Sequence, residues 1–190
     1  RHAHVHRDEA VVLEARLGRA RGIMRGLISR AQQDPRRVVF PEGEDPKILR
    51  AAQILVDEQI AQPILLGRMD RVRHLADELG IPLDGITLEE PGASKRRDAY
   101  AQLLWAKRQR KGMSLDEANQ LITRAITFGS VMVSAGDADA LVGGIGKHYP
   151  ETVRPALEVI GADKKVGLAS GLYMLVFEKH IVFFGDTTVN

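Results

Sequence analysis

The sequence alternates short apolar runs with longer segments whose apolar residues recur at helical spacing, and this alternation limits the possible folds more than any other feature. Strands are predicted at Val38–Phe40, Pro63–Gly67, Gly85–Leu88 and Ala138–Val142, with helices between most of them. Two strands separated by a helix pair in parallel, because only a long connection allows the crossover. The alternation therefore predicts an α/β domain of three layers, α/β/α, with a mostly parallel sheet. The strand near Gly85 is short and flanked by polar residues, so we expect it at an edge.

Capping residues predict where several helices begin and end. Asp45 followed by Pro46 predicts an N-cap with proline at the first helical position. Gly80 predicts a helix end, and the segment SLDE at residues 114–117 is a capping box. The apolar spacing predicts one continuous helix from this box to Ala125 and another from Pro150 to about residue 160.

The two ends of the chain differ from its middle. Residues 10 to about 30 predict a basic amphipathic helix that glycines weaken, and the segment from Val166 onward predicts two strands joined by residues 178–179. We expect a lead-in segment over 1–34, one domain over 35–163 and the first strands of an incomplete second domain over 164–190. The chain starts at Arg1 and stops just after a predicted strand, so we expect a piece of a longer protein.

Composition excludes several classes of protein. The 190 residues contain no cysteine, which rules out disulfide scaffolds, thiolate nucleophiles and cysteine-ligated zinc. No stretch approaches the roughly 20 apolar residues of a membrane helix. The net charge is +2 and only 5% of residues are aromatic, so neither charge nor stacking favours nucleic acid. We expect a cytoplasmic protein.

A glycine-rich loop is the most suggestive local feature. Gly143-Gly-Ile-Gly146 follows a predicted strand and precedes Lys147 and His148. Glycines in this position let the backbone approach a phosphate closely, and a neighbouring cation adds charge. The dinucleotide-binding pattern is incomplete, because its third glycine is missing. The loop is either part of an anion site or an ordinary turn.

Basic, acidic and histidine clusters each leave two interpretations open. Arg108, Arg110 and Lys111 (with basic residues 95–97 upstream) form either an anion site or a solvated helix end. Arg154 lies at a helix start, where a cation opposes the helix dipole, so we expect it to have an acidic partner or a bound anion. The acids of PEGED at 41–45 are either a solvated cap or ligand contacts. The alternating histidines 2, 4 and 6 either bind a metal or belong to a linker.

Several segments together resemble the phosphotransacetylase (phosphate acetyl/butyryltransferase) family. They extend from about residue 36 to the last residue and are VVFPEGED (38–45) with ILRAA (48–52), RQRKG (108–112) with SLDEA (114–118), GDADALV (136–142), TVRPA (152–156) and FGDTTVN (184–190). The resemblance implies an isocitrate/isopropylmalate dehydrogenase-like fold and acetyl transfer between coenzyme A and phosphate in a cleft between two α/β domains. It also implies that Arg108 and Arg154 face that cleft. The family's catalytic serine and aspartate lie beyond Asn190, so no catalytic residue is expected here.

Two departures from the family pattern bear on activity. Active members carry Ser-Gly in place of Gly143-Gly144 and a serine-rich turn in place of residues 147–151. The loss of these hydroxyls resembles the phosphotransacetylase-type domain at the C-terminus of hybrid NADP-dependent malic enzymes. In those proteins the domain senses acetyl-coenzyme A and restrains the upstream malic-enzyme domain.

The resemblance therefore implies an acetyl-coenzyme A-sensing regulatory domain. The residues expected to contact the acyl ligand are Arg108, Arg154, Gly143, Gly144, Lys147, His148 and Thr152. No metal or cofactor is expected on this chain, and NADP with a divalent metal is expected only in an upstream malic-enzyme domain. The expected partners are acetyl-coenzyme A or a related acyl anion, that upstream domain and further copies of the chain, with no nucleic acid and no membrane. The alternatives are a fragment of an active phosphate acetyltransferase and a non-catalytic oligomerisation module.

Overall fold

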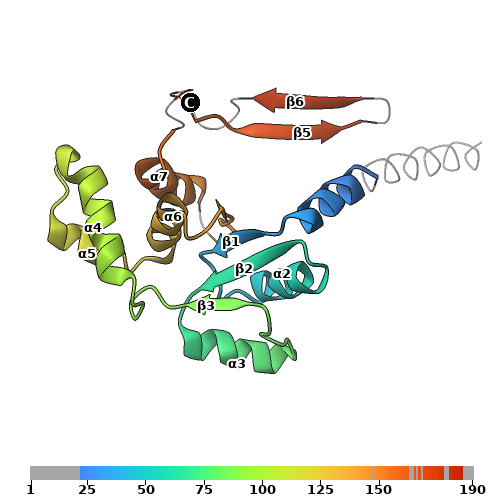
Figure 1. Ribbon diagram of the computed structural model, residues 1–190, viewed down its shortest axis with the longest axis horizontal. Coiled ribbons are helices and arrows are strands. Elements are labelled where there is room, and N and C mark those ends of the chain that lie inside the picture. Colours follow the sequence, from blue (N-terminus) through green and yellow to red (C-terminus); the bar gives the residue numbers. More distant parts are fainter. Residues whose placement is uncertain are drawn as a thin grey trace, which may run out of the picture. The chain divides into compact units, whose positions relative to one another are not determined.

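The computed structural model of the chain describes residues 22–146, 148–162, 165, 167, 169–177 and 180–185 (Figure 1). The chain divides into two compact units. One spans Asp34–Ala162, and the other combines Arg1–Gln33 with Asp163–Asn190. Each unit is described by itself.

A parallel sheet of four strands forms the centre of the first unit. Its strands are β1 (Arg36–Phe40), β2 (Ala61–Leu66), β3 (Thr87–Glu89) and β4 (Ala140–Leu141). Their order is β3-β2-β1-β4, and every neighbouring pair is parallel. The prediction of a parallel sheet with the short third strand at an edge is confirmed.

Helices cover both faces of this sheet (Figure 1). The helical elements are α2 (Pro46–Asp57), α3 (Met69–Leu79), α4 (Arg97–Arg108), the short 3₁₀ helix η1 (Gln109–Lys111), α5 (Leu115–Leu121), α6 (Ala125–Ala135) and α7 (Tyr149–Val159). Because side chains alternate along a strand, Val39 packs with buried residues of α4, α5, α6 and α7, whereas Phe40 packs with those of α2 and α3. The three-layer α/β/α prediction is therefore confirmed.

Local capping chemistry acts as the sequence predicts. The Asp45 carboxylate accepts a hydrogen bond from the Lys47 backbone N–H at 2.7 Å and so caps α2. Gly80 ends α3 in the left-handed conformation with φ 64°. The Ser114 hydroxyl accepts from the Glu117 N–H at 3.1 Å and caps α5.

The predicted continuous helix beyond Ser114 is wrong, because the chain forms two helices there. Helix α5 ends at Leu121, and α6 begins at Ala125 after Arg124 adopts an extended conformation. Helix α6 is buried over residues 127–132. At Gly129 a Cβ would lie 3.0 Å from the Leu141 side chain, so the glycine allows α6 to approach the sheet closely. Helical spacing cannot reveal a helix that is apolar on nearly all sides.

A polar network joins the amino-terminal ends of β1 and β4. Arg37 donates to both carboxylate oxygens of Asp139 and to the backbone carbonyls of Gly136 and Asp137. The hydrogen bonds from Arg37 lower the pKa of Asp139 to about 2. The Asp137 carboxylate in turn accepts a hydrogen bond from the buried Tyr100 hydroxyl. The pKa of Tyr100 is raised, mainly because the side chain is buried and secondly because of this hydrogen bond. The network ties the end of α6 to the sheet, on the side opposite the strands' carboxyl ends.

The second unit contains a helix over residues 22–33 and an antiparallel hairpin. This helix corresponds to the last part of the predicted basic helix. Residues 10–21 of that prediction lie outside the described residues. The hairpin pairs β5 (Leu172–Val176) with β6 (Ile181–Gly185), which confirms the two predicted strands. The predicted joining residues 178–179 lie outside the described residues. No helix within the described ranges is long and apolar enough to span a bilayer.

Candidate functional site

The order of the strands creates a crevice at the carboxyl ends of β1 and β4. The chain passes from β1 through β2 to β3 in one direction and then returns to place β4 on the other side of β1. After β1 it continues into α2 on one face of the sheet, and after β4 into α7 on the other face. In open α/β sheets, ligands bind where strand order reverses in this way.

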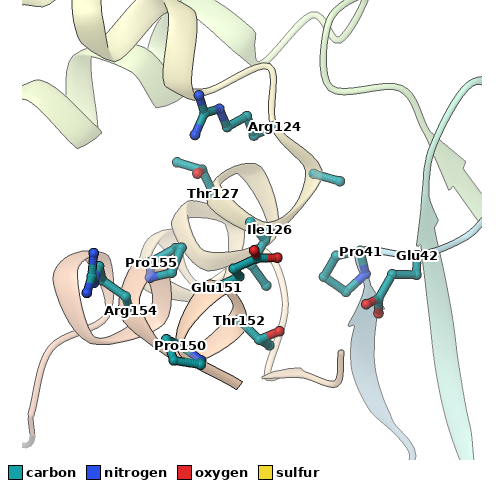
Figure 2. A pocket seen from close by; sticks show the side chains of 11 residues that line it. Pro41, Glu42, Arg124, Ile126, Thr127, Pro150, Glu151, Thr152, Arg154 and Pro155 are labelled. Atoms are coloured by element: carbon teal, nitrogen blue, oxygen red, sulfur yellow. The ribbon is translucent and has the colours of Figure 1, made fainter. Parts of the chain in front are cut away.

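A cavity of about 670 Å³ lies at this crevice (Figure 2). This volume is typical of small-molecule sites, which span roughly 300–1,000 Å³. Its walls are the end of β1, the start of α6 and the beginning of α7. The lining residues are Pro41, Glu42, Arg124, Ala125, Ile126, Thr127, Pro150, Glu151, Thr152, Arg154 and Pro155.

Two cations and an uncapped helix terminus favour an anion in this pocket. Within the described part of the chain, neither Arg124 nor Arg154 forms an ion pair with a carboxylate. Figure 2 shows their guanidinium groups on the α6 and α7 side of the pocket. Arg124 is also the cap residue of α6 and makes no side-chain capping bond, so the first N–H groups of that helix remain available.

Negative charge also lines the pocket, at the end of β1 and on α7. Glu42 follows β1 and lies across the pocket from Arg154 in Figure 2, and Glu151 belongs to the first turn of α7. The hydroxyls of Thr127 and Thr152 add neutral hydrogen-bonding groups between these charges. The site therefore suits a ligand that presents an anionic group to the arginines and hydrogen-bond donors to the carboxylates.

The glycine loop is held by Glu42. The Gly144 backbone N–H donates to both carboxylate oxygens of Glu42, each at 3.0 Å. Gly144 has φ 111°, a conformation that favours glycine, and a Cβ there would lie 3.5 Å from the Thr152 hydroxyl oxygen. This N–H thus binds a carboxylate of the chain itself.

The predicted ligand residues do not all line the pocket. Thr152 and Arg154 do, and Gly143 and Gly144 lie beside Glu42. Arg154 is in the second turn of α7 rather than the first, because the helix already begins at Tyr149. The exposed His148 is the cap residue of α7 and makes no side-chain capping bond. Lys147 is outside the described residues, as are the histidines of the first 21 residues.

Arg108 pairs with α7 and is not among the pocket-lining residues. Its Nη2 is 3.4 Å from Oε1 of Glu158, and its side chain is only 18% exposed. Its Nε is buried and has no hydrogen-bond partner within the described residues. Within the same ranges, no three His, Asp or Glu side chains gather into a metal site.

Arg124 and Thr127 were missed as candidate site residues. The helix predicted from the capping box to Ala125 contains Arg124 and ends just before Thr127, and neither position has a special role in it. Their place in the pocket depends on the break between α5 and α6. The sequence does offer one signal, because residues 125–135 carry no charged side chain, whereas the helix that precedes them is partly exposed and charged.

The fold and the site define a doubly wound α/β domain with a pocket at its topological switch point that arginines, carboxylates and hydroxyls line. Residues 22–190 match the family model described as "Phosphate acetyl/butaryl transferase". The chain belongs to this family, as the sequence motifs predicted.

Individual relatives agree with this assignment. The chain is 35% identical over 164 residues to the phosphate acetyltransferase of Nitratidesulfovibrio vulgaris, covering 86% of this chain and 23% of the relative. It is 31% identical to that of Corynebacterium glutamicum, covering 86% of this chain and 50% of the relative. The solved EutD phosphotransacetylase from Staphylococcus aureus superposes with a TM-score of 0.77 at 30% identity, over 88% of this chain and 52% of that one. The chain thus spans half or less of these two phosphate acetyltransferases.

Proposed function

We propose that this chain forms part of a phosphate acetyltransferase, which exchanges an acetyl group between coenzyme A and phosphate. In this reaction a phosphate oxygen bonds to the carbonyl carbon and the carbonyl–sulfur bond of acetyl-coenzyme A breaks. The sulfur takes up the proton that the phosphate loses, so that acetyl phosphate and the free thiol of coenzyme A result. The observation that carries the proposal is the pocket at the switch point, with the guanidinium groups of Arg124 and Arg154 unpaired among the described residues. Family membership and the named relatives support it.

The pocket's groups suit binding and orientation of the phosphate-bearing substrate. Arg124 and Arg154 present planar forks that match phosphate oxygens. The N-terminus of α6 adds backbone donors and the positive end of a helix dipole. The hydroxyl of Thr127 lies between them on the first turn of α6 and can hydrogen-bond the same group.

Regulatory sensing of acetyl-coenzyme A is the second candidate. The loop that carries Gly143 and Gly144 lacks the hydroxyls of active family members, and its Gly144 N–H already binds Glu42. That loop favours binding without transfer. The relatives named above are phosphate acetyltransferases, which supports transfer more strongly, and none of these findings supports a malic-enzyme partner, NADP or oxidoreductase activity. A cytoplasmic location and a homo-oligomer stay predictions.

Two measurements test the proposal and separate the candidates. The full-length natural protein is supplied with acetyl-coenzyme A and inorganic phosphate, and both free thiol and acetyl phosphate are measured. Calorimetry with acetyl-coenzyme A on the same protein reports binding. A transferase gives equal amounts of both products. Binding without turnover contradicts the proposed transfer and supports the sensor, and absence of both binding and turnover contradicts both candidates.

A further inference from the structure

The segment PEGED at residues 41–45 follows β1 and binds the loops that follow the two neighbouring strands, β2 and β4. Its three carboxylates each accept a hydrogen bond from a backbone N–H of a different part of the chain. These bonds are Glu42 from Gly144 N at 3.0 Å, Glu44 from Arg68 N at 2.9 Å and Asp45 from Lys47 N at 2.7 Å. The acids in this segment are therefore more than a solvated cap. Of the three, only Glu42 lines the pocket.

Glu42 spans from β1 to the connection between β4 and α7. Both of its carboxylate oxygens lie 3.0 Å from the Gly144 nitrogen. The adjacent Gly143 packs so closely that a Cβ there would lie 3.3 Å from the Glu42 carboxylate and 3.3 Å from the Pro41 ring. Gly144 itself is close to Thr152 in the first turn of α7, because a Cβ on Gly144 would lie 3.5 Å from the Thr152 hydroxyl oxygen. The Glu42 carboxylate thus holds a residue that neighbours Thr152.

Glu42 carries a negative charge in a pocket that favours an anion, so its effect on ligand affinity depends on its role. A carboxylate beside an anion site repels the ligand, so on charge alone its removal strengthens binding. A carboxylate that instead sets the geometry of the site has the opposite effect, because small misplacements of binding groups are costly. The two roles therefore predict opposite signs for the same substitution.

We propose that Glu42 is a positioning residue of the pocket. Its carboxylate holds the Gly144 N–H and thereby sets the beginning of α7, with Thr152 and Arg154, for the anionic substrate. The inference rests on the proposed function of the same pocket. According to this inference, the length of the Glu42 side chain determines ligand affinity, and its charge does not.

Two substitutions separate reach from charge. Glu42→Gln keeps the length of the side chain and one acceptor oxygen but removes the charge. Glu42→Asp keeps the charge but withdraws the carboxylate by one methylene group. If Glu42 positions the loop, Glu42→Gln binds acetyl-coenzyme A within about threefold of the wild type, whereas Glu42→Asp binds roughly tenfold more weakly. Calorimetry on the full-length natural protein measures both affinities.

Glu44→Asp is the matched control. Glu44 belongs to the same segment and accepts the same kind of backbone hydrogen bond, but it is not among the pocket-lining residues. Its shortening should leave acetyl-coenzyme A affinity unchanged. A second readout is the hydrogen exchange of the Gly144 amide in the full-length natural protein. Glu42→Asp should speed this exchange, and Glu44→Asp should leave it unchanged.

The outcomes distinguish this inference from the proposed function. Wild-type protein that neither binds nor turns over acetyl-coenzyme A overturns the proposed function. Wild-type protein that binds, together with a Glu42→Asp variant of unchanged affinity, overturns the positioning role alone. If Glu42→Gln binds acetyl-coenzyme A more tightly and Glu42→Asp binds it with unchanged affinity, only the charge of Glu42 matters. If Glu42→Asp and Glu44→Asp weaken the affinity equally, the effect is a general one of the loop. Either result also overturns the inference.

Discussion

The guanidinium Nη2 of Arg108 lies 3.4 Å from Oε1 of Glu158, joining the end of α4 to α7. Glu158 is four residues beyond Arg154, so both project from the same side of α7. The two arginines that the family resemblance implies as cleft residues therefore meet at one helix. Arg108 already has a carboxylate there, whereas Arg154 has none within the described residues. Arg154 is thus the one that is ready to bind an anion.

Replacing Arg154 should weaken substrate binding. A charge-assisted hydrogen bond contributes about 1.5–3 kcal/mol, so Arg154→Ala should reduce acetyl-coenzyme A or acetyl phosphate affinity roughly tenfold to a hundredfold. Arg154→Lys should recover only part of this, because lysine lacks the planar fork. Calorimetry on the full-length natural protein measures the change. Arg110→Ala is a suitable control, since that arginine is exposed on η1 and outside the pocket. Equal affinities for wild type and Arg154→Ala would refute an anion-binding role.

A serine at position 143 should raise acetyl transfer. Gly143→Ser adds the hydroxyl that active family members carry there, and one neutral hydrogen bond of about 1 kcal/mol corresponds to roughly fivefold in rate. The new Cβ would lie 3.3 Å from Pro41 and from Glu42, so we expect a stability loss of about 1 kcal/mol. Gly143→Ala carries the same steric cost without the hydroxyl. If both variants give the same initial rate of acetyl phosphate formation, the hydroxyl has no role.

The ion pair between Arg37 and Asp139 should make stability depend on pH in the acid range. Hydrogen bonds from Arg37 lower the Asp139 pKa from 3.8 to about 2. Above about pH 4, Asp139 is ionised in both the folded and the unfolded chain, and the pair contributes fully. As pH falls from about 4 to about 2, only the unfolded chain takes up the proton, so this contribution is lost.

Urea unfolding of wild type and Asp139→Asn between pH 2 and 6 checks this dependence. The wild type should be more stable by a constant amount above about pH 4, and this difference should shrink as the pH approaches 2. A difference in unfolding free energy that is the same at every pH would contradict the prediction.

The β5–β6 hairpin should make the 190-residue chain self-associate. Leu172 is 69% exposed and Phe183 is 60% exposed, and the paired strands carry no charged side chain. Exposed apolar strands pair with other chains. Light scattering should show a mass that rises with concentration, and Phe183→Asp should lower it. Leu103→Asp, on the exposed side of α4, serves as the control. A monodisperse monomer at high concentration would count against this.

Local features of the fold followed from the sequence alone. The caps at Asp45, Gly80 and Ser114 involve residues at most a few positions apart, so the chain's own neighbours decide them. The strands β1 and β2 each contain a short apolar run, and their separation by one helix favours parallel pairing. The family motifs also lie within short segments, and they identified the family correctly.

The order of the strands and the composition of the pocket depended on contacts that no local pattern encodes. Residues 121–125 contain neither glycine nor proline, so no helix-breaking residue marks the break that places Arg124 in the pocket. It results from packing α6 flat against the sheet, where Gly129 meets Leu141. Glu42 and Gly144 are 102 residues apart, and they meet only because β4 adds beside β1 rather than beside β3. Side-chain periodicity reports which face of an element is buried, but only the assembled sheet decides which loops share its carboxyl edge.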